Sequence, residues 1–204
     1  FCKLFFSAPS VMASCCSPSQ RVSIFSNTNR CLKVGRCAKL PLSITNVRLS
    51  SHTLPFPADM NLQLLSISAM PEIIKLLCFL NPSVCEETML RRYEKILREF
   101  PNYRILGAYI DGRLAGLTGV WHGAKIWCGD YMEIDNLVVH PDYRNRGVAT
   151  ALIQKVELMA REKQCNILVL DSYTNNHPSH RLYHRLGCEI WGFHFVKPLA
   201  NFEH

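Results

Sequence analysis

The segment that decides the fold reads LVVHPDYRNRGVAT and covers residues 137–150. It joins an apolar strand end to a basic turn and then to the start of a helix, so it predicts an anion cradle. The first turn of a helix leaves its N–H groups unpaired, and the helix dipole adds roughly half a positive charge there. Gly147 lets a ligand approach the backbone closely, while Arg144 and Arg146 add charge-assisted contacts.

Two interpretations of this segment stay open from the residues alone. It is either a phosphate-binding turn or a strand-to-helix turn that carries two solvated arginines. The sequence contains neither the glycine and lysine spacing of a P-loop nor the G-x-G-x-x-G turn of dinucleotide-binding proteins. Those two classes of nucleotide site are therefore excluded.

Strands and helices are expected on both sides of this segment. Hydrophobic periodicity predicts strands over residues 61–68, 103–110, 113–122, 131–140, 167–170 and 190–196, and helices over residues 71–80, 84–100, 147–164 and 178–186. Asp111-Gly112 predicts a hairpin between the second and third strands. The strand of residues 131–140 alternates until Asn136 and then runs apolar, which suits a β-bulge. The order indicates an α/β or α+β sandwich with a mostly antiparallel front and a mixed sheet of about six strands and about four helices.

The charge of the chain is confined to its first part. The 204 residues carry a formal charge of +7, yet seven of the 23 Lys and Arg residues and none of the 16 Asp and Glu residues lie in residues 1–58. Residues 59–204 therefore hold 16 residues of each sign and are formally neutral. Because the basic part has no interleaved aromatic pattern, no nucleic-acid partner is expected. No apolar run reaches membrane-spanning length, so no membrane partner is expected either.

Residues 1–58 are interpreted as a leader, and residues 59–204 as the folded domain. The leader is rich in serine, lacks acidic residues and shows no sustained periodicity, which is typical of an organellar transit peptide. Met12 is a plausible start for such a peptide, and Met60 is a rival start. The protein is expected in a plastid or mitochondrion if the leader is a transit peptide, and in the cytoplasm if translation starts at Met60.

Two motifs of the domain resemble those of one enzyme superfamily. Arg144-x-x-Gly147-x-Ala149 is similar to motif A of the GCN5-related N-acetyltransferase (GNAT) superfamily. The second motif resembles motif B, with serine in place of alanine, and reads Asn176-x-x-Ser179-x-x-Leu182-Tyr183-x-x-x-Gly187. The resemblance spans about residues 60–198 and implies the GNAT fold, with acetyl-CoA as the co-substrate and no metal.

The resemblance also implies which residues bind the co-substrate. The helix N-terminus would hold the pyrophosphate of acetyl-CoA, the end of the preceding strand would lie along the pantetheine arm, and Asn176 would hydrogen-bond that arm. The expected binding residues are Leu137, Val138, Val139, Arg144, Asn145, Arg146, Gly147, Val148, Ala149, Thr150 and Asn176.

Two further residues match the catalytic positions of the family. Glu133, eleven residues before Arg144, is placed where the histone-acetyltransferase branch has its catalytic glutamate, and Asp135 is the substitute two residues on. Tyr183 matches the family's general acid. The alternatives that stay open are a solvated Glu133 on the polar face and a Tyr183 that packs beside Leu182 and Leu186.

The implied function is direct transfer of an acetyl group to a primary amine of a small molecule or a protein. The alternative is a non-catalytic module of the same fold that senses acyl-CoA. His177, His180 and His184 have helical spacing, but no fourth ligand accompanies them, so no metal site is expected. Members of the family often dimerise, which makes a homodimer a further alternative. The acceptor loops are expected near residues 74–87 and 121–131, and they carry no motif that identifies the acceptor.

Overall fold

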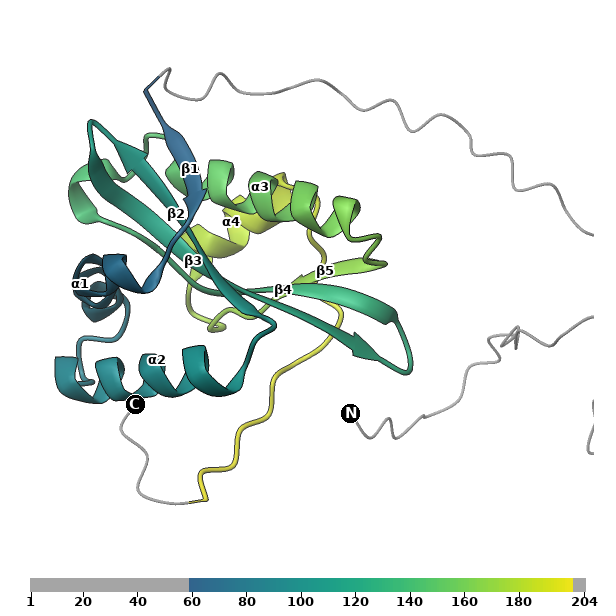
Figure 1. Cartoon of the computed structure of the whole chain (residues 1–204). Coiled ribbons are helices and arrows are strands. Elements are labelled where there is room, and N and C mark those ends of the chain that lie inside the picture. The colour runs from purple at the N-terminus through teal and green to yellow at the C-terminus, as the bar shows by residue number, and fades with distance from the viewer. Residues whose placement is uncertain (1–58, 200–204) are drawn as a thin grey trace, which may run out of the picture. The chain divides into compact units, whose positions relative to one another are not determined.

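The computed structural model describes residues 59–199, which contain five strands and four helices (Figure 1). The predicted leader of residues 1–58 lies outside these described residues. In chain order the elements are β1 (Asn61–Leu64), α1 (Met70–Leu80), α2 (Glu86–Glu99), β2 (Tyr103–Ile110), β3 (Arg113–Lys125), β4 (Gly129–Val139), α3 (Val148–Glu162), β5 (Ile167–Leu170) and α4 (His177–Arg185). Short 3-10 turns precede α1 and follow β4. None of the helices in residues 59–199 is long and apolar enough to span a membrane.

The strands form one mixed sheet in the order β1-β2-β3-β4-β5. The first four strands pair antiparallel, and β5 pairs parallel to β4, so the predicted mixed sheet with an antiparallel front is confirmed. The predicted hairpin between β2 and β3 is confirmed as well. Asp111 and Gly112 at its turn have φ angles of 49° and 72°, which is the left-handed pair that a tight hairpin turn requires.

Helices cover both faces of the sheet and enclose two clusters of buried side chains. On one face α1 and α2 pack through Ile73, Leu76 and Met89 against residues of β2, β3 and β4. On the other face α3 packs through Leu152 and Val156 against a second set of strand residues. Figure 1 shows α1 and α2 on one side of the strands and α3 on the other. The sheet is thus buried on both faces, with β3 at its centre and β4 between β3 and the edge strand β5.

The predicted closing strand over residues 190–196 is wrong for the described chain. These residues are irregular, and no backbone hydrogen bond in residues 59–199 involves them. A strand needs a neighbour for its N–H and C=O groups, and the apolar alternation that predicted this one is also compatible with an unpaired extended segment. Its apolar side chains stay exposed, Trp191 to 73% and Phe195 to 90%, and Figure 1 shows the segment (yellow) leaving the sheet.

A bulge in β4 shapes the part of the sheet that follows Glu133. Leu117 pairs with Val138 and Gly119 pairs with Asp135, so β4 carries one more residue than β3 between these pairs. Asn136 is the residue in the left-handed region, with a φ of 50°. The predicted bulge is therefore confirmed. It coincides with the end of the pairing between β4 and β5 at Ile134 and Leu170, beyond which β4 continues beside β3 alone.

Candidate functional site

The N-terminus of α3 is an open anion cradle. Gly147 precedes the helix with φ 78° and ψ 2°, and no side chain of the described residues caps the first turn. A Cβ placed on Gly147 would meet no atom of the described residues within 4 Å, apart from the adjoining residues of the turn, so this side of the turn is open. The N–H groups of Val148, Ala149 and Thr150 precede the first hydrogen bond of the helix, which Ala151 donates to Gly147. The helix dipole and these unpaired donors favour an anion here.

The two arginines of the turn are exposed and carry charge beside the cradle. Arg144 donates through Nε to the carbonyl of Val139 at 3.4 Å, and the Arg146 guanidinium lies 5.4 Å from the centre of the Tyr143 ring. Neither arginine forms an ion pair within residues 59–199. Both therefore keep donors for an anionic ligand, which favours the phosphate-binding interpretation of this turn over a solvated one.

The expected pantetheine residues line the separation of β4 from β5, but their side chains differ in direction. Val138 is buried against α1 and α2, whereas Leu137 and Val139 pack toward the α3 face. The N–H of His140 donates to the carbonyl of Ala115 on β3, and Val138, two residues earlier, pairs with Leu117 on the same strand. The backbone groups of Val138 therefore also face β3, and this residue presents neither its side chain nor its backbone groups to the gap.

Asn176 has a structural role that the sequence analysis did not consider. It precedes α4, and its side-chain Oδ1 accepts a hydrogen bond of 3.4 Å from the backbone N–H of Ser179. The pattern of an asparagine before a helix with Pro178 in its first turn is typical of an N-cap and could have predicted this. The amide nitrogen of the side chain remains a donor for a ligand, because only the oxygen serves as the cap.

Glu133 lies on the α1 and α2 face of β4, just before the strands diverge. It pairs in register with Trp121 on β3 and with Val169 on β5, and its side chain is half-buried. Burial raises the pKa of Glu133, Lys125 lowers it in part, and the carboxylates of Asp171 and Asp135 raise it further. A carboxylate in such surroundings is a better proton acceptor than a free glutamate.

Asp135 belongs to a hydrogen-bonded group with Trp121 and Tyr103, which the sequence did not predict. Trp121 donates through Nε1 to its carboxylate at 3.4 Å, and the hydroxyl of Tyr103 reaches the same carboxylate. Burial raises the pKa of Asp135, and its hydrogen bonds with Trp121, Asn136 and Tyr103 lower it in part. Burial and then the nearby carboxylate raise the pKa of Tyr103. Asp135 is thus already hydrogen-bonded by its neighbours, whereas no hydrogen bond to the Glu133 carboxylate forms within the described part of the chain, so Glu133 is the freer of the two to accept a proton.

Tyr183 lies on α4, and its surroundings are compatible with both earlier interpretations, a packed core aromatic and a general acid. It packs with Leu182 and Leu186 against the cluster beneath α3, as a core aromatic would. Burial raises the pKa of Tyr183, Ser179 lowers it through a hydrogen bond, and Cys188 raises it. The phenol is therefore held in the protonated form at neutral pH, which is the form that a general acid needs.

Two of the three histidines of α4 bond to the backbone through their rings, and the His177 ring lies edge-on to that of His180 with 6.0 Å between the ring centres. His180 Nε2 lies 2.9 Å from the carbonyl of Tyr173, and His184 Nδ1 lies 3.0 Å from the carbonyl of Cys188. Residues 59–199 contain no group of three His, Cys, Asp or Glu side chains that could hold a metal ion.

The expected acceptor loops lie in different places. The connection between α1 and α2 meets the connection between β5 and α4 at a hollow of about 350 Å³ lined by Leu80, Asn81, Pro82, Ser83, Tyr173 and Asn175. The tip of the β3–β4 hairpin is exposed, with Trp127 58% accessible. The connection between α1 and α2 is therefore the one of the two expected loops that meets the segment between β5 and α4.

A mixed sheet with a diverging parallel pair, next to an open helix N-terminus, defines an α/β protein with an anion cradle. The chain belongs to the acetyltransferase (GNAT) family, whose sequence model matches residues 70–188.

Individual relatives agree with this family. The chain is 30% identical over 100 residues to a protein of Bacillus subtilis (strain 168) provisionally named as a ribosomal protein bS18-alanine N-acetyltransferase, a match that covers 49% of this chain and 62% of that protein. It is 31% identical over 70 residues to an aminoglycoside N(6')-acetyltransferase type 1 of Acinetobacter baumannii, which covers 34% of this chain and 44% of that protein. The chain thus spans about half the length of the curated relatives it matches.

Solved structures share the fold. An aminoglycoside N-acetyltransferase AAC(6')-Iy in complex with CoA superposes with a TM-score of 0.62 at 22% identity, over 72% of this chain and 99% of that chain. At this identity the likeness shows the fold, which confirms the predicted GNAT architecture.

Proposed function

We propose that the described domain transfers the acetyl group of acetyl-CoA directly to a primary amine of a small molecule or a protein. The observation that carries this proposal is the uncapped N-terminus of α3, which opens next to the gap between β4 and β5. The names of the relatives support N-acetylation of amines, and the CoA complex of the AAC(6')-Iy structure supports acetyl-CoA as the co-substrate.

The cradle would hold the pyrophosphate of acetyl-CoA. The N–H groups of Val148, Ala149 and Thr150 point toward the open space, and Arg144 and Arg146 add two positive charges. The pantetheine arm would then extend from the cradle into the gap, where the backbone of Leu137 and of Val139 and the amide of Asn176 would offer hydrogen bonds. The thioester would then lie toward Glu133, because the arm would run back along β4 from its C-terminal end.

The transfer requires two proton movements. The amine nitrogen attacks the thioester carbonyl, the C–S bond breaks as the C–N bond forms, and no acyl-enzyme is needed. A lysine-like amine has a pKa of about 10.4, so presenting it uncharged at neutral pH costs roughly 4 kcal/mol. Glu133 would accept the amine proton directly or through water, and Tyr183 would donate a proton to the leaving thiolate.

A screen of acceptor amines tests the proposal. The full chain is incubated with acetyl-CoA and with polyamines, aminoglycosides, amino acids and peptides, and the release of free CoA thiol is measured. Thiol release that depends on one acceptor class, with the acetylated amine found by mass spectrometry, supports the transferase. Tight acetyl-CoA binding without turnover on any amine would instead support the non-catalytic acyl-CoA module.

Replacing Glu133 with glutamine is expected to change the pH profile of the reaction. The rate should fall at least about 10-fold near neutral pH, because the amine loses its proton acceptor, and should recover as pH rises toward the pKa of the amine. The measurement is kcat/KM from pH 6 to about 10, with the exposed Glu162→Gln on α3 as the matched control. A loss that is equal at every pH would contradict the role as base.

The same variant should not be less stable than the wild type. The folded-state pKa of Glu133 is raised, so its contribution to stability is complete below the unfolded pKa and is lost as pH rises through the folded pKa. At neutral pH the Glu133→Gln variant no longer has to bury a charged carboxylate, which costs free energy in the folded wild type. A melting temperature at or above the wild-type value would therefore separate lost catalysis from lost folding.

Replacing Tyr183 with phenylalanine is expected to lower kcat at least about 10-fold and to leave acetyl-CoA affinity nearly unchanged, since the ring still packs beside Leu182 and Leu186. Steady-state kinetics and calorimetry measure the two quantities separately. Tyr109→Phe on β2 is the matched control, because it removes a partly buried tyrosine hydroxyl on the opposite face of the sheet from the cluster that Tyr183 packs against. An unchanged kcat in Tyr183→Phe would remove this residue from the mechanism.

A further inference from the structure

A hydrogen-bonded carboxylate and imidazole join the chain after α4 to the end of β5. Asp171 directly follows β5, and His194 belongs to the irregular segment of residues 190–196. The Nδ1 atom of His194 lies 2.7 Å from Oδ2 of Asp171, although the two residues are 23 positions apart in the sequence. The proposed transfer of an acetyl group leaves this Asp171–His194 pair without a role.

The pair lies on the same face of the sheet as Glu133. Leu168 and Leu170 of β5 pack in the cluster beneath α3, so Val169 and Asp171 point to the opposite face, which is that of Glu133. Glu133 pairs in register with Val169, two residues before Asp171. Two residues of a strand advance about 7 Å and neighbouring strands lie about 5 Å apart, so the Cα atoms of Glu133 and Asp171 are about 8 Å apart.

The electrostatic surroundings of Glu133 include both members of the pair. Burial raises the pKa of Glu133 and Lys125 lowers it; after these causes, Asp171 and Asp135 raise it and His194 lowers it. All four of these groups are therefore close enough to act on the charge of Glu133. The imidazole is the one side chain among them of a type that takes up and releases protons readily near neutral pH.

The hydrogen bond within the pair determines which nitrogen of His194 can accept a proton. An ionised carboxylate has no hydrogen to donate, so the hydrogen of this bond is on Nδ1, and Nε2 is left as the acceptor of the neutral ring. Asp171 also favours the ring in its protonated, positively charged form. The side chains of His194 and Asp171 are 62% and 64% accessible, so a proton on Nε2 can pass to water.

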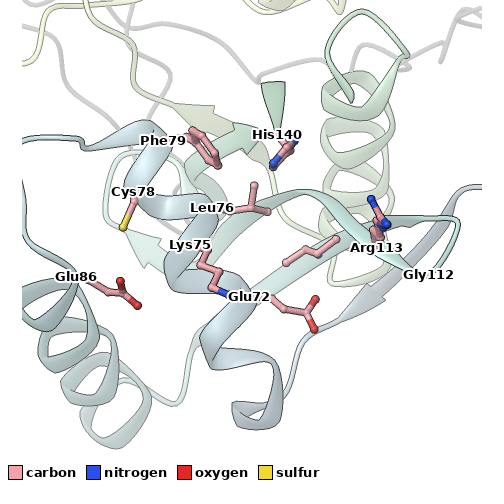
Figure 2. Close-up of a pocket in the computed structure, with 10 residues that line it drawn as sticks. Glu72, Lys75, Leu76, Cys78, Phe79, Glu86, Gly112, Arg113 and His140 are labelled. Carbon is pink, nitrogen blue, oxygen red and sulfur yellow. The ribbon is translucent and has the colours of Figure 1, made fainter. Parts of the chain in front are cut away.

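The two hollows of the described chain do not account for the pair. A hollow of about 590 Å³ lies against α1 and the β2–β3 turn (Figure 2), and neither Asp171 nor His194 lines it. Neither residue lines the hollow of about 350 Å³ beside the connection between α1 and α2. The position of the pair beside Glu133 is therefore the observation from which its role is inferred.

We propose that the Asp171–His194 pair receives the proton that Glu133 takes from the amine and releases it to solvent. This inference rests on the proposed acetyl transfer. An acceptor that begins as an ammonium ion loses two protons when it becomes an amide. One of them replaces the acetyl group on the CoA sulfur through Tyr183, and the other has to leave the site in every turnover.

The second proton would travel from Glu133 to His194 through water. The O–H bond of the protonated Glu133 carboxyl breaks, the bridging water passes a proton on, and an N–H bond forms at Nε2 of His194. Asp171 stabilises the resulting imidazolium ion, which then loses its proton to bulk water. Glu133 is thereby returned to the ionised form that can accept a proton from the next amine.

Chemical rescue of the His194→Ala variant tests the proposal, with an acceptor amine found by the thiol-release screen. The kcat should fall at least about 10-fold, because Glu133 loses its proton slowly. Added imidazole, which replaces the missing base, should raise the kcat of the variant at least about 5-fold. Pyrazole, a ring of the same shape and a far weaker base, should not. Phe195→Ala is the matched control, because it removes an exposed neighbouring ring that takes up no proton, and its kcat should stay at the wild-type value with or without imidazole.

Double variants show through which residue the pair acts. In the Glu133→Gln background no proton reaches position 133, so adding His194→Ala should lower kcat by less than about 2-fold. Asp171→Asn should lower kcat in the wild-type background and should have little effect once His194 is alanine, because Asp171 acts through the imidazole ring. Effects of Glu133→Gln and His194→Ala that multiply fully would contradict the proposal.

The remaining outcomes separate this inference from the proposed function. If the wild type turns over an amine and His194→Ala has an unchanged kcat, the relay is refuted and the transferase stands. A loss that imidazole does not restore, or that pyrazole restores equally, would also refute the relay, since the ring would then only fill space. A wild type that releases no thiol with any amine would refute the transferase, and the relay with it.

Discussion

Acetyl-CoA should bind the Gly147→Glu variant at least about 100-fold more weakly than the wild type, which is a loss of about 2.7 kcal/mol. The new carboxylate would project into the open space before α3, where the proposed cradle receives the pyrophosphate. Like charges brought together in a binding site cost several kcal/mol, and the side chain also fills the space that the ligand needs. Calorimetric titration with acetyl-CoA measures the effect.

Gly147→Asn is the control for this variant. Gly147 has a φ of 78°, a conformation that glycine adopts freely and that asparagine tolerates better than other residues, so asparagine separates backbone strain from charge. We expect it to weaken acetyl-CoA much less than glutamate does. Equal losses in the two variants would show that strain, and not charge in the cradle, decides the affinity. Wild-type affinity in Gly147→Glu would remove the cradle from the proposed site.

Gly119→Ala should destabilise the domain by about 3 kcal/mol, at the upper end of the cost of an overpacked core. Gly119 is buried in β3, and a Cβ at this position would collide with the hydroxyl and ring of Tyr103. The ring cannot move aside cheaply, because it is buried, packs on Trp121 at 4.5 Å and reaches the Asp135 carboxylate through its hydroxyl. Chemical denaturation monitored by circular dichroism measures the change.

Gly123→Ala on the same strand is the matched control. Its Cβ would approach the ring of Tyr131 no closer than 3.0 Å, and that ring is only partly buried and can shift. Because alanine also restricts the unfolded chain, this variant should unfold within about 1 kcal/mol of the wild type. A Gly119→Ala variant as stable as Gly123→Ala would show that Tyr103 is not held where the structure has it.

The features of the fold that could be predicted from the sequence are those that short stretches of sequence determine. Asp111-Gly112 specifies the hairpin because both residues accept positive φ, and the break of alternation at Asn136 marks the bulge because side chains on a strand alternate. The uncapped start of α3 could be expected from Gly147 alone. In each case the deciding interaction lies within a few residues of the signal.

The remaining features depend on partners that are distant in the sequence. The strand expected at residues 190–196 has the right alternation, but whether it pairs depends on β5 and not on its own residues. The hydrogen bonds from Trp121 on β3 and Tyr103 on β2 to Asp135 on β4 join three strands, and no pattern in the sequence predicts them. The role of Asn176 as an N-cap could have been predicted from Pro178 in the first turn of α4. It was not predicted, because Asn176 was assigned only the ligand-binding role that the resemblance to motif B implies.

Because of the extra residue at Asn136, the direction of the side chains in the last part of β4 depends on the number of residues in the strand. Before it, Met132 and Ile134 pack toward α3; after it, Val138 packs toward α1 and α2. Removing one residue there would turn the last three residues of the strand over and would move Val138, now 5% accessible, from the α1 and α2 cluster to the α3 face. Aligned relatives of this protein should therefore keep Gly, Asn or Asp at position 136, where φ is 50°, and should show almost no insertion or deletion between positions 133 and 139.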